Sequence, residues 1–338
     1  MLGPAEPERS PETAQRIAAA YSRPFQLHAS IGTCCGIARY AEDRLEVWTH
    51  SQGVGLLRGA LATVFGLPAE AVVVRHRQGA GCYGHNGADD VAMDAALVAR
   101  HHPGRHVRVV WQREDELTAG PLSAAMTVAI EAGIDGEGRP VDWSMEIVSP
   151  SHNTRPGVGG QPNLATAEAL PVPFGRCTDM DVPDNRGAGG CRHAIALYDL
   201  PAQRIFHRLV PTLPVRTSAL RGLGALANVF AIESFMDELA LAAGRDPVAY
   251  RLGLMSDPRG RRVIEHVAAM AGWDPEAEPG TGAGRGVAFS RYKNHAGYAA
   301  IVAEVEVEEE VRVTRVFAAV DAGLVVNPDG AKNQIEGG

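Results

Sequence analysis

Residues 78–90 have the composition of a ligand-binding loop. Four glycines, Gly79, Gly81, Gly84 and Gly87, separate an apolar run at 71–74 from a helical pattern at 91–99. A strand that leads through a glycine-rich loop into a helix presents free backbone N–H groups to an anion or a metal-bound oxygen. Glycine permits positive φ and lets a ligand approach the backbone closely. We therefore expect this loop to bind a ligand.

The spacing Gly79-x-Gly81-x-x-Gly84 also matches a dinucleotide fingerprint. That fingerprint requires an acidic residue about 20 residues further on, after the next strand, to bind the ribose. Gly104 occupies that place, and the nearest acids, Glu114 and Asp115, follow only beyond the strand. A dinucleotide-binding oxidoreductase is therefore a weaker alternative, and a purely structural turn is another.

The elements around this loop indicate an α+β fold with mixed sheets, antiparallel hairpins and flanking helices. Hydrophobic periodicity predicts a short helix from Glu12 to Ala20 and a longer helix over 53–65 with Ser51 as its N-cap. Residues 150–192 have little periodicity, and a loop of this length is usually functional or mobile. Further strands are expected at 45–49, 71–74, 106–111, 125–132, 141–148, 297–308 and 311–320, and further helices at 229–244, after Asp246, at 266–271 and from Asn327.

Composition excludes several classes of protein. The 338 residues carry a net charge of −8, and no run of Lys or Arg is longer than a pair, which argues against nucleic acid and anionic membrane surfaces as partners. No apolar stretch approaches the roughly 18 residues of a membrane span, and the Pro-rich N-terminus does not resemble a signal peptide. Five cysteines without a C-x-x-C pattern do not indicate disulfides, structural zinc or an iron–sulfur cluster.

A series of motifs in order gives a more specific indication. The segments are, in order, Thr49-His50-Ser51-Gln52-Gly53, Gly66-Leu67-Pro68, Gly79-Ala80-Gly81-Cys82-Tyr83-Gly84-His85, Trp111 to Glu116, Tyr198 to Pro201, Thr217 to Gly224, and Val320 to Gly337. This series resembles the molybdenum-binding large subunit of the xanthine dehydrogenase and aldehyde oxidase family, which has a Thr-Gln segment, a helix ending in Gly-x-Pro, a glycine loop and an Arg-Gly-Phe-Gly segment.

The resemblance implies a binding site for molybdopterin, with the molybdenum held by the pterin and by no side chain. The oxo ligands of such a metal are acceptors, so they require neutral donors such as the Gln52 amide and the backbone N–H groups of the loop. The Arg221 guanidinium would stabilise developing negative charge. The implied cofactor-binding residues are Gln52, Gly81, Cys82, Tyr83, Gly84, Arg221, Gly222 and Gln334.

This sequence departs from the family pattern within the loop. Cys82 replaces a Phe, Tyr83 a Gly and His85 a Lys, and we hypothesise that Cys82 and Tyr83 reshape the pocket for a particular substrate. The Gly-His pair and the segment Arg291 to His295 are most similar to enzymes that hydroxylate isoquinoline or nicotinate. His28 is expected to be a structural, hydrogen-bonded histidine.

The resemblance also sets expectations for the whole enzyme. It would hydroxylate an aromatic N-heterocycle or an aldehyde, using molybdopterin, expected in its cytosine dinucleotide form, and passing electrons to a small [2Fe–2S] subunit and on to a cytochrome or other acceptor. We expect a tail (1–20), a first molybdopterin-binding region (21–225) and the start of a second (226–338).

The family's general base is a Glu in a later Gly-Glu segment, expected beyond residue 338, and Glu336 does not take that role. We expect a fragment or split subunit that is silent until another chain supplies the missing half. The alternative is a non-catalytic pterin-binding half-subunit. The compartment would be cytoplasmic, or periplasmic after export with a partner.

Overall fold

The computed structural model describes residues 12–201, 203–277 and 280–338. Most of the tail predicted over 1–20 lies outside these residues. The strands are β1 (Gln15–Arg23), β2 (Cys35–Ala41), β3 (Arg44–Thr49), β4 (Val72–His76), β5 (His106–Val110), β6 (Leu122–Ser123), β7 (Met126–Ile134), β8 (Pro140–Ser149), β9 (Gln203–Leu209), β10 (Thr217–Ser218), β11 (Ala283–Arg291), β12 (Tyr298–Val307) and β13 (Val311–Asp321). The α-helices are α1 (Val54–Phe65), α2 (Ala88–His101), α3 (Arg113–Ala119), α4 (Ala165–Glu168), α5 (Ala225–Ala242), α6 (Pro247–Gly253), α7 (Pro258–Met270) and α8 (Pro328–Glu336).

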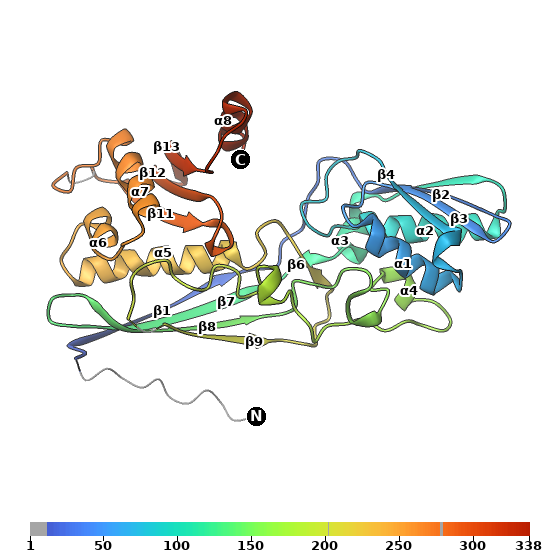
Figure 1. The fold of residues 1–338 in the computed structure, drawn as a ribbon, viewed down its shortest axis with the longest axis horizontal. Coiled ribbons are helices and arrows are strands. Elements are labelled where there is room, and N and C mark those ends of the chain that lie inside the picture. Colours follow the sequence, from blue (N-terminus) through green and yellow to red (C-terminus); the bar gives the residue numbers. More distant parts are fainter. Residues whose placement is uncertain (1–11, 202, 278–279) are drawn as a thin grey trace.

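A long sheet in the order β1-β7-β8-β9 runs beneath much of the molecule (Figure 1). Alternating apolar side chains of β7 and β8, among them Ile130 and Met145, point into a core that α5 closes with Phe235 and Met236. The helix predicted from Glu12 to Ala20 is wrong, because Gln15–Arg23 forms β1 and pairs antiparallel with β7. Its alternate side chains pack against the long sheet's core, so tertiary pairing overrides the local helical pattern.

A second sheet in the order β4-β3-β2-β5 forms a separate lobe with α1 and α2 (Figure 1). The predicted strands at 45–49 and 71–74 and the helix at 53–65 are confirmed, and Gly66 ends α1 at a φ of +64°. The N-cap prediction is wrong, since Gly53 occupies that position. The Ser51 hydroxyl instead accepts a hydrogen bond from the Gly53 N–H and donates one to another element.

The C-terminal part packs a third sheet, β11-β12-β13, against α7, with α6 and α5 below it (Figure 1). The predicted hairpins 125–132/141–148 and 297–308/311–320 are confirmed, as is the helix that Asp246 caps through the Ala249 N–H. Mixed sheets with mostly antiparallel neighbours and flanking helices make the fold α+β, as predicted.

The stretch 150–192 forms a folded connection with only short helical turns. Its side chains His152, Thr154, Asn163 and Leu164 are buried. Leu164 joins the core of the β2–β5 lobe, and Cys191 packs against the core of the long sheet. This segment therefore contacts both lobes.

Candidate functional site

The glycine loop and the Arg221 segment lie side by side. Gly84 and Leu220 form an isolated antiparallel bridge. The His85 N–H donates to the Ala219 carbonyl at 2.7 Å, and the Arg221 N–H donates to the Tyr83 carbonyl at 2.6 Å. Two segments that the sequence separates widely therefore form one surface. The short parallel pair β6–β10 supports it immediately upstream.

This close approach requires glycine at position 84. Its φ is +130°, and a Cβ placed there would lie 2.0 Å from the Ala219 carbonyl oxygen. Gly81 has a φ of +92°, and Tyr83 also has a positive φ of +49°. Gly222, with a φ of +87°, differs from Gly84 because a Cβ there would meet no atom within 4 Å. The surface is thus tight at the bridge and open at Gly222.

Gln52 and Cys82 meet at the start of α1. The Cys82 thiol is buried and donates to the His50 carbonyl at 3.0 Å, and burial raises the pKa of this thiol. The Gln52 side chain is exposed, and its amide makes no hydrogen bond to any residue that the structure describes. Tyr83 is 45% exposed. Of the three loop residues that depart from the family pattern, Tyr83 therefore faces outward, whereas Cys82 and His85 are buried.

A buried chain of polar contacts joins the Gln52 segment to the loop. The Ser51 hydroxyl donates to Asp89 at 2.5 Å, and the other Asp89 oxygen lies 3.1 Å from His85 Nε2. His85 Nδ1 lies 2.8 Å from the Ser218 hydroxyl, which accepts from the Thr154 N–H. Burial opposes the Asp89 charge, but the bonds from His85 and Ser51 prevail and lower its pKa. This chain fixes four elements around the loop.

A buried ion pair anchors α2 to the segment before Arg221. Asp90 accepts from the two terminal guanidinium nitrogens of Arg216, Nη1 and Nη2, at 2.9 and 2.5 Å, and also from the Ala165 N–H. The sequence indicates only a helix-dipole role for Asp89 and Asp90, in the first turn of α2. It does not indicate their long-range partners, because no local signal identifies them.

The remaining predicted residues, His28 and Gln334, lie in different parts of the structure. His28 is hydrogen-bonded, as predicted, with Nε2 donating to the Ala219 carbonyl at 2.9 Å, and burial lowers its pKa. An Arg221 Nη2 atom lies 3.9 Å from the position of a Cβ at Gly338. The C-terminal turn of α8, which carries Gln334, is therefore adjacent to Arg221. The Gln334 side chain itself is exposed.

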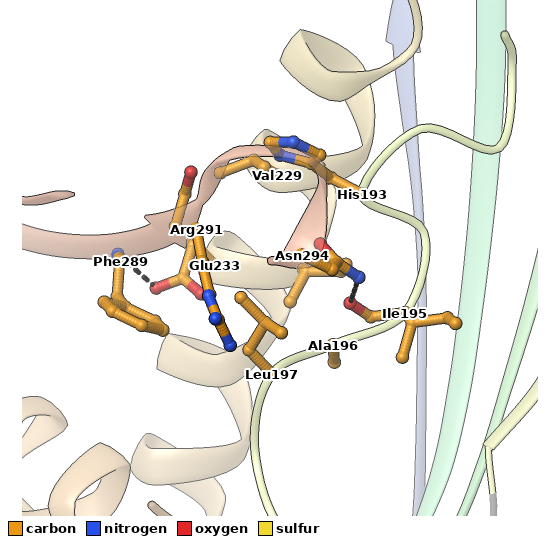
Figure 2. Close-up of a pocket in the computed structure, with 11 residues that line it drawn as sticks. His193, Ile195, Ala196, Leu197, Val229, Glu233, Phe289, Arg291 and Asn294 are labelled. Carbon is orange, nitrogen blue, oxygen red and sulfur yellow. Dashed lines mark hydrogen bonds between the residues drawn. The ribbon is translucent and has the colours of Figure 1, made fainter. Parts of the chain in front are cut away.

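The segment Arg291 to His295 lies elsewhere, at the small pocket shown in Figure 2. Asn294 Nδ2 donates to the Ile195 carbonyl, and the Lys293 N–H donates to His193 Nε2 at 2.6 Å. Glu233, in the same pocket, accepts from Phe289, Tyr198 and Arg251. This pocket is therefore a structural joint in which the carboxylate is fully engaged.

The surface is suited to a group that carries acceptor oxygens. Its donors include the neutral Gln52 amide, the loop N–H groups and the Arg221 guanidinium, and Gly222 leaves free space beside them. Within the described ranges no group of three or more His, Cys, Asp or Glu side chains is arranged to hold a metal ion. A metal brought by an organic ligand is compatible with these donors.

The fold and this surface define the class of the protein. The molybdopterin cofactor-binding domain family matches residues 5–156 and 181–253, and a second family of molybdopterin cofactor-binding domains matches residues 231–338. The chain belongs to the molybdopterin-binding large subunits of the xanthine dehydrogenase and aldehyde oxidase family, as its motifs predicted.

Two curated relatives illustrate the likeness. The B subunit of nicotinate dehydrogenase from Pseudomonas putida is 37% identical over 96% of this chain and 27% of its own length. The beta subunit of isoquinoline 1-oxidoreductase from Brevundimonas diminuta is 30% identical over 94% of this chain and 38% of its own length. The chain thus spans about a quarter to two fifths of the length of these relatives.

Solved structures support the fold. Quinoline 2-oxidoreductase from Pseudomonas putida 86 superposes with a TM-score of 0.64 at 17% identity, covering 86% of this chain and 36% of that chain. Aldehyde oxidoreductase from Desulfovibrio gigas gives 0.61 at 18% identity, covering 89% of this chain and 33% of that chain.

The dinucleotide alternative finds no support in the topology. A dinucleotide unit places the strands before and after its helix next to each other. Here β4 and β5, which flank the glycine loop and α2, are separated by β3 and β2.

Within the described residues, no helix is long and apolar enough to cross a membrane.

Proposed function

We propose that this chain forms the molybdopterin-binding part of a hydroxylase that inserts water-derived oxygen into an aromatic N-heterocycle or an aldehyde. The observation that carries the proposal is the Gly84–Leu220 bridge, which unites the glycine loop with Arg221 and Gly222. The identities of 37% and 30% with nicotinate dehydrogenase and isoquinoline oxidoreductase chains favour an N-heterocycle.

In this proposal each residue of the surface has a distinct task. The Gln52 amide and the N–H groups of residues 81–84 donate hydrogen bonds to the cofactor's oxygens. Arg221 stabilises negative charge that develops on the bound substrate, and Gly222 leaves room beside it. Gln334 contacts the pterin from α8. When bound, molybdopterin supplies a metal centre that accepts two electrons from the substrate.

Regions 21–225 and 226–338 are proposed as the two sides that hold the cofactor, expected in its cytosine dinucleotide form. The electrons would then pass to a small [2Fe–2S] subunit and on to a cytochrome or another acceptor. Asp89 is held by Ser51 and His85, so it is assigned a structural role rather than that of a base. Glu336 forms an exposed pair with Lys332 at 3.5 Å and is not assigned that role either.

The test is co-expression of this chain with the remaining length of a relative's large subunit and a [2Fe–2S] subunit. Molybdenum and pterin content are measured, followed by hydroxylation of N-heterocycles in ¹⁸O-labelled water. The expected result is metal with pterin and labelled product. Bound pterin without turnover in the complete assembly would favour the non-catalytic half-subunit, and neither metal nor pterin would refute both.

A further inference from the structure

Three side chains beside the glycine loop are arranged like the acid, imidazole and hydroxyl of a hydrolase. His85 Nε2 lies 3.1 Å from Asp89 Oδ2, and His85 Nδ1 lies 2.8 Å from Ser218 Oγ. Such a series makes the hydroxyl a nucleophile only where a substrate can reach it. Here His85 is 1% exposed, Asp89 3% and Ser218 0%. The three side chains are therefore closed to a substrate, and what they can do is hold other parts of the site.

The neighbours of His85 fix its tautomer. The pKa of Asp89 is lowered, so its carboxylate is ionised, accepts hydrogen bonds only, and faces a protonated Nε2. At the other end of the ring, Ser218 Oγ accepts the Thr154 N–H at 3.2 Å. The proton of the Ser218 hydroxyl then has His85 Nδ1 as its acceptor. His85 therefore joins the two segments as a neutral imidazole that carries its proton on Nε2.

One end of this series holds the segment that carries Arg221. The His85 side chain engages Ser218, and the His85 N–H donates to the Ala219 carbonyl at 2.7 Å. Ser218 and Ala219 lie just before Arg221 in the chain. The Arg221 side chain is exposed and forms no hydrogen bond or ion pair with any residue in the described ranges. The direction of its guanidinium therefore depends on the position of its backbone.

The other end of the series holds the backbone on both sides of Gln52. The second oxygen of Asp89 accepts from Ser51 Oγ at 2.5 Å, and Ser51 Oγ accepts from the Gly53 N–H at 3.0 Å. Gln52 lies between these two residues in the chain. The buried acid therefore fixes the backbone at Gln52, while the imidazole beside it fixes the segment of the other donor of the surface.

We infer that His85 is a positioning residue for the reaction and acts through Arg221. It accepts from Ser218 while Asp89 orients its ring, and so it holds the guanidinium where negative charge develops on the substrate. The inference rests on the proposed function, which gives Arg221 that task, and it adds a residue that is itself closed to the substrate. A displacement of about 1 Å at such a site can lower a rate about 100-fold.

The first measurement compares two substitutions at position 85 in the assembled enzyme. His85→Asn keeps an amide group near the place of Nδ1, so Ser218 retains an acceptor while Asp89 loses its neighbour. His85→Gln reaches Asp89 with its amide but offers Ser218 no acceptor. We expect His85→Gln to lower kcat about 10- to 100-fold and to change KM less than about threefold, because Arg221 acts on charge that appears during the reaction. His85→Asn should keep kcat within about threefold of the parent enzyme.

A double-mutant cycle tests whether His85 acts through Arg221. Arg221→Gln removes the guanidinium, so adding His85→Gln to it should lower kcat by less than a further factor of about two. Additive losses would overturn the inference, as would equal losses of kcat in His85→Asn and His85→Gln. His102→Gln makes the same change at an exposed position and is the matched control, which should alter neither kcat nor KM.

Ser218→Ala provides a second route to the same result if His85→Gln does not fold. It removes the hydroxyl that His85 engages and changes little else in size. The loss of kcat should match that expected for His85→Gln, and an unchanged kcat would overturn the inference. Circular dichroism confirms that each variant is folded.

The second measurement needs no turnover and uses the 338-residue chain. Nitrogen NMR of the imidazole should show the His85 proton on Nε2, and hydrogen exchange of the Arg221 amide should be faster in His85→Gln than in His85→Asn. If the assembled enzyme hydroxylates nothing, these results still support the positioning of Arg221, and only the proposed function fails. A proton on Nδ1, or equal exchange of Arg221 in the two variants, would overturn the inference.

Discussion

Replacing Gly84 by Ala tests whether the bridge between the glycine loop and the Arg221 segment holds the site together. The added Cβ would lie 2.0 Å from the Ala219 carbonyl oxygen, so the two segments must separate by roughly 1.4 Å to reach ordinary contact at 3.4 Å. That movement stretches the bonds from His85 N–H to Ala219 and from Arg221 N–H to Tyr83, now 2.7 and 2.6 Å, beyond hydrogen-bonding distance.

The expected cost follows from these contacts. Each lost hydrogen bond contributes about 0.5–1.5 kcal/mol, and an alanine forced to positive φ adds about 1–2 kcal/mol. We expect Gly84→Ala to lower the free energy of unfolding by about 2–5 kcal/mol. Gly104→Ala is the matched control, because Gly104 has a φ of +78° but a Cβ there would meet nothing within 4 Å. Gly104→Ala should lower the free energy of unfolding only by the cost of placing an alanine at positive φ, about 1–2 kcal/mol.

Urea denaturation followed by far-ultraviolet circular dichroism measures both variants. Hydrogen exchange of the His85 and Arg221 amides provides a local readout, and we expect faster exchange of both in Gly84→Ala alone. The reasoning is that the close approach to Ala219, rather than the positive φ alone, requires glycine at position 84. It would be refuted if the two variants lost equal stability and hydrogen exchange at His85 and Arg221 were unchanged.

Three further predictions follow from buried groups. Burial lowers the pKa of His193 from its usual 6.5 to about 4, so the folded state binds fewer protons than the unfolded state between these values. Stability should therefore fall by up to about 3 kcal/mol through His193 as pH drops from 6.5 to 4. Burial also lowers the pKa of His152 to about 4, so His193→Gln should reduce the slope of stability against pH in urea titrations without removing it. An unchanged slope contradicts the prediction. Asp90→Asn leaves the Arg216 charge buried and should lower the free energy of unfolding by about 3–5 kcal/mol. The double variant with Arg216→Met should lose less. Additive losses from the two substitutions would argue against coupling between them. Cys82→Phe should lower the free energy of unfolding by about 1–3 kcal/mol because it overpacks a buried site. Tyr83→Ala should leave stability nearly unchanged and alter the substrate range of the assembled enzyme. An unaltered substrate range would show that Tyr83 does not line the pocket.

Local sequence determined most of the secondary structure. Patterns with a clear period, such as the hairpin strands β7 and β8 and the helix α1 with its Gly66 stop, were predicted correctly because their side-chain spacing alone defines which face is buried. The segment of β1 has a helical local pattern but is a strand, since its strand character depends on pairing with β7, over a hundred residues away. Ser51 has the residue type of an N-cap, but its hydroxyl is engaged by Asp89, which only the packing of α2 brings near.

The sequence and the tertiary structure also determined different features of the candidate site. The sequence by itself determined the family, through ordered motifs, and the need for glycine in the loop, because backbone conformation is encoded in single residues. Only the tertiary structure decided that the loop meets the Arg221 segment at Gly84, that Cys82 points inward while Tyr83 points outward, and that His85 lies between Asp89 and Ser218. These facts depend on contacts between distant segments, and such contacts are set by how all the buried surfaces pack at once rather than by any local pattern.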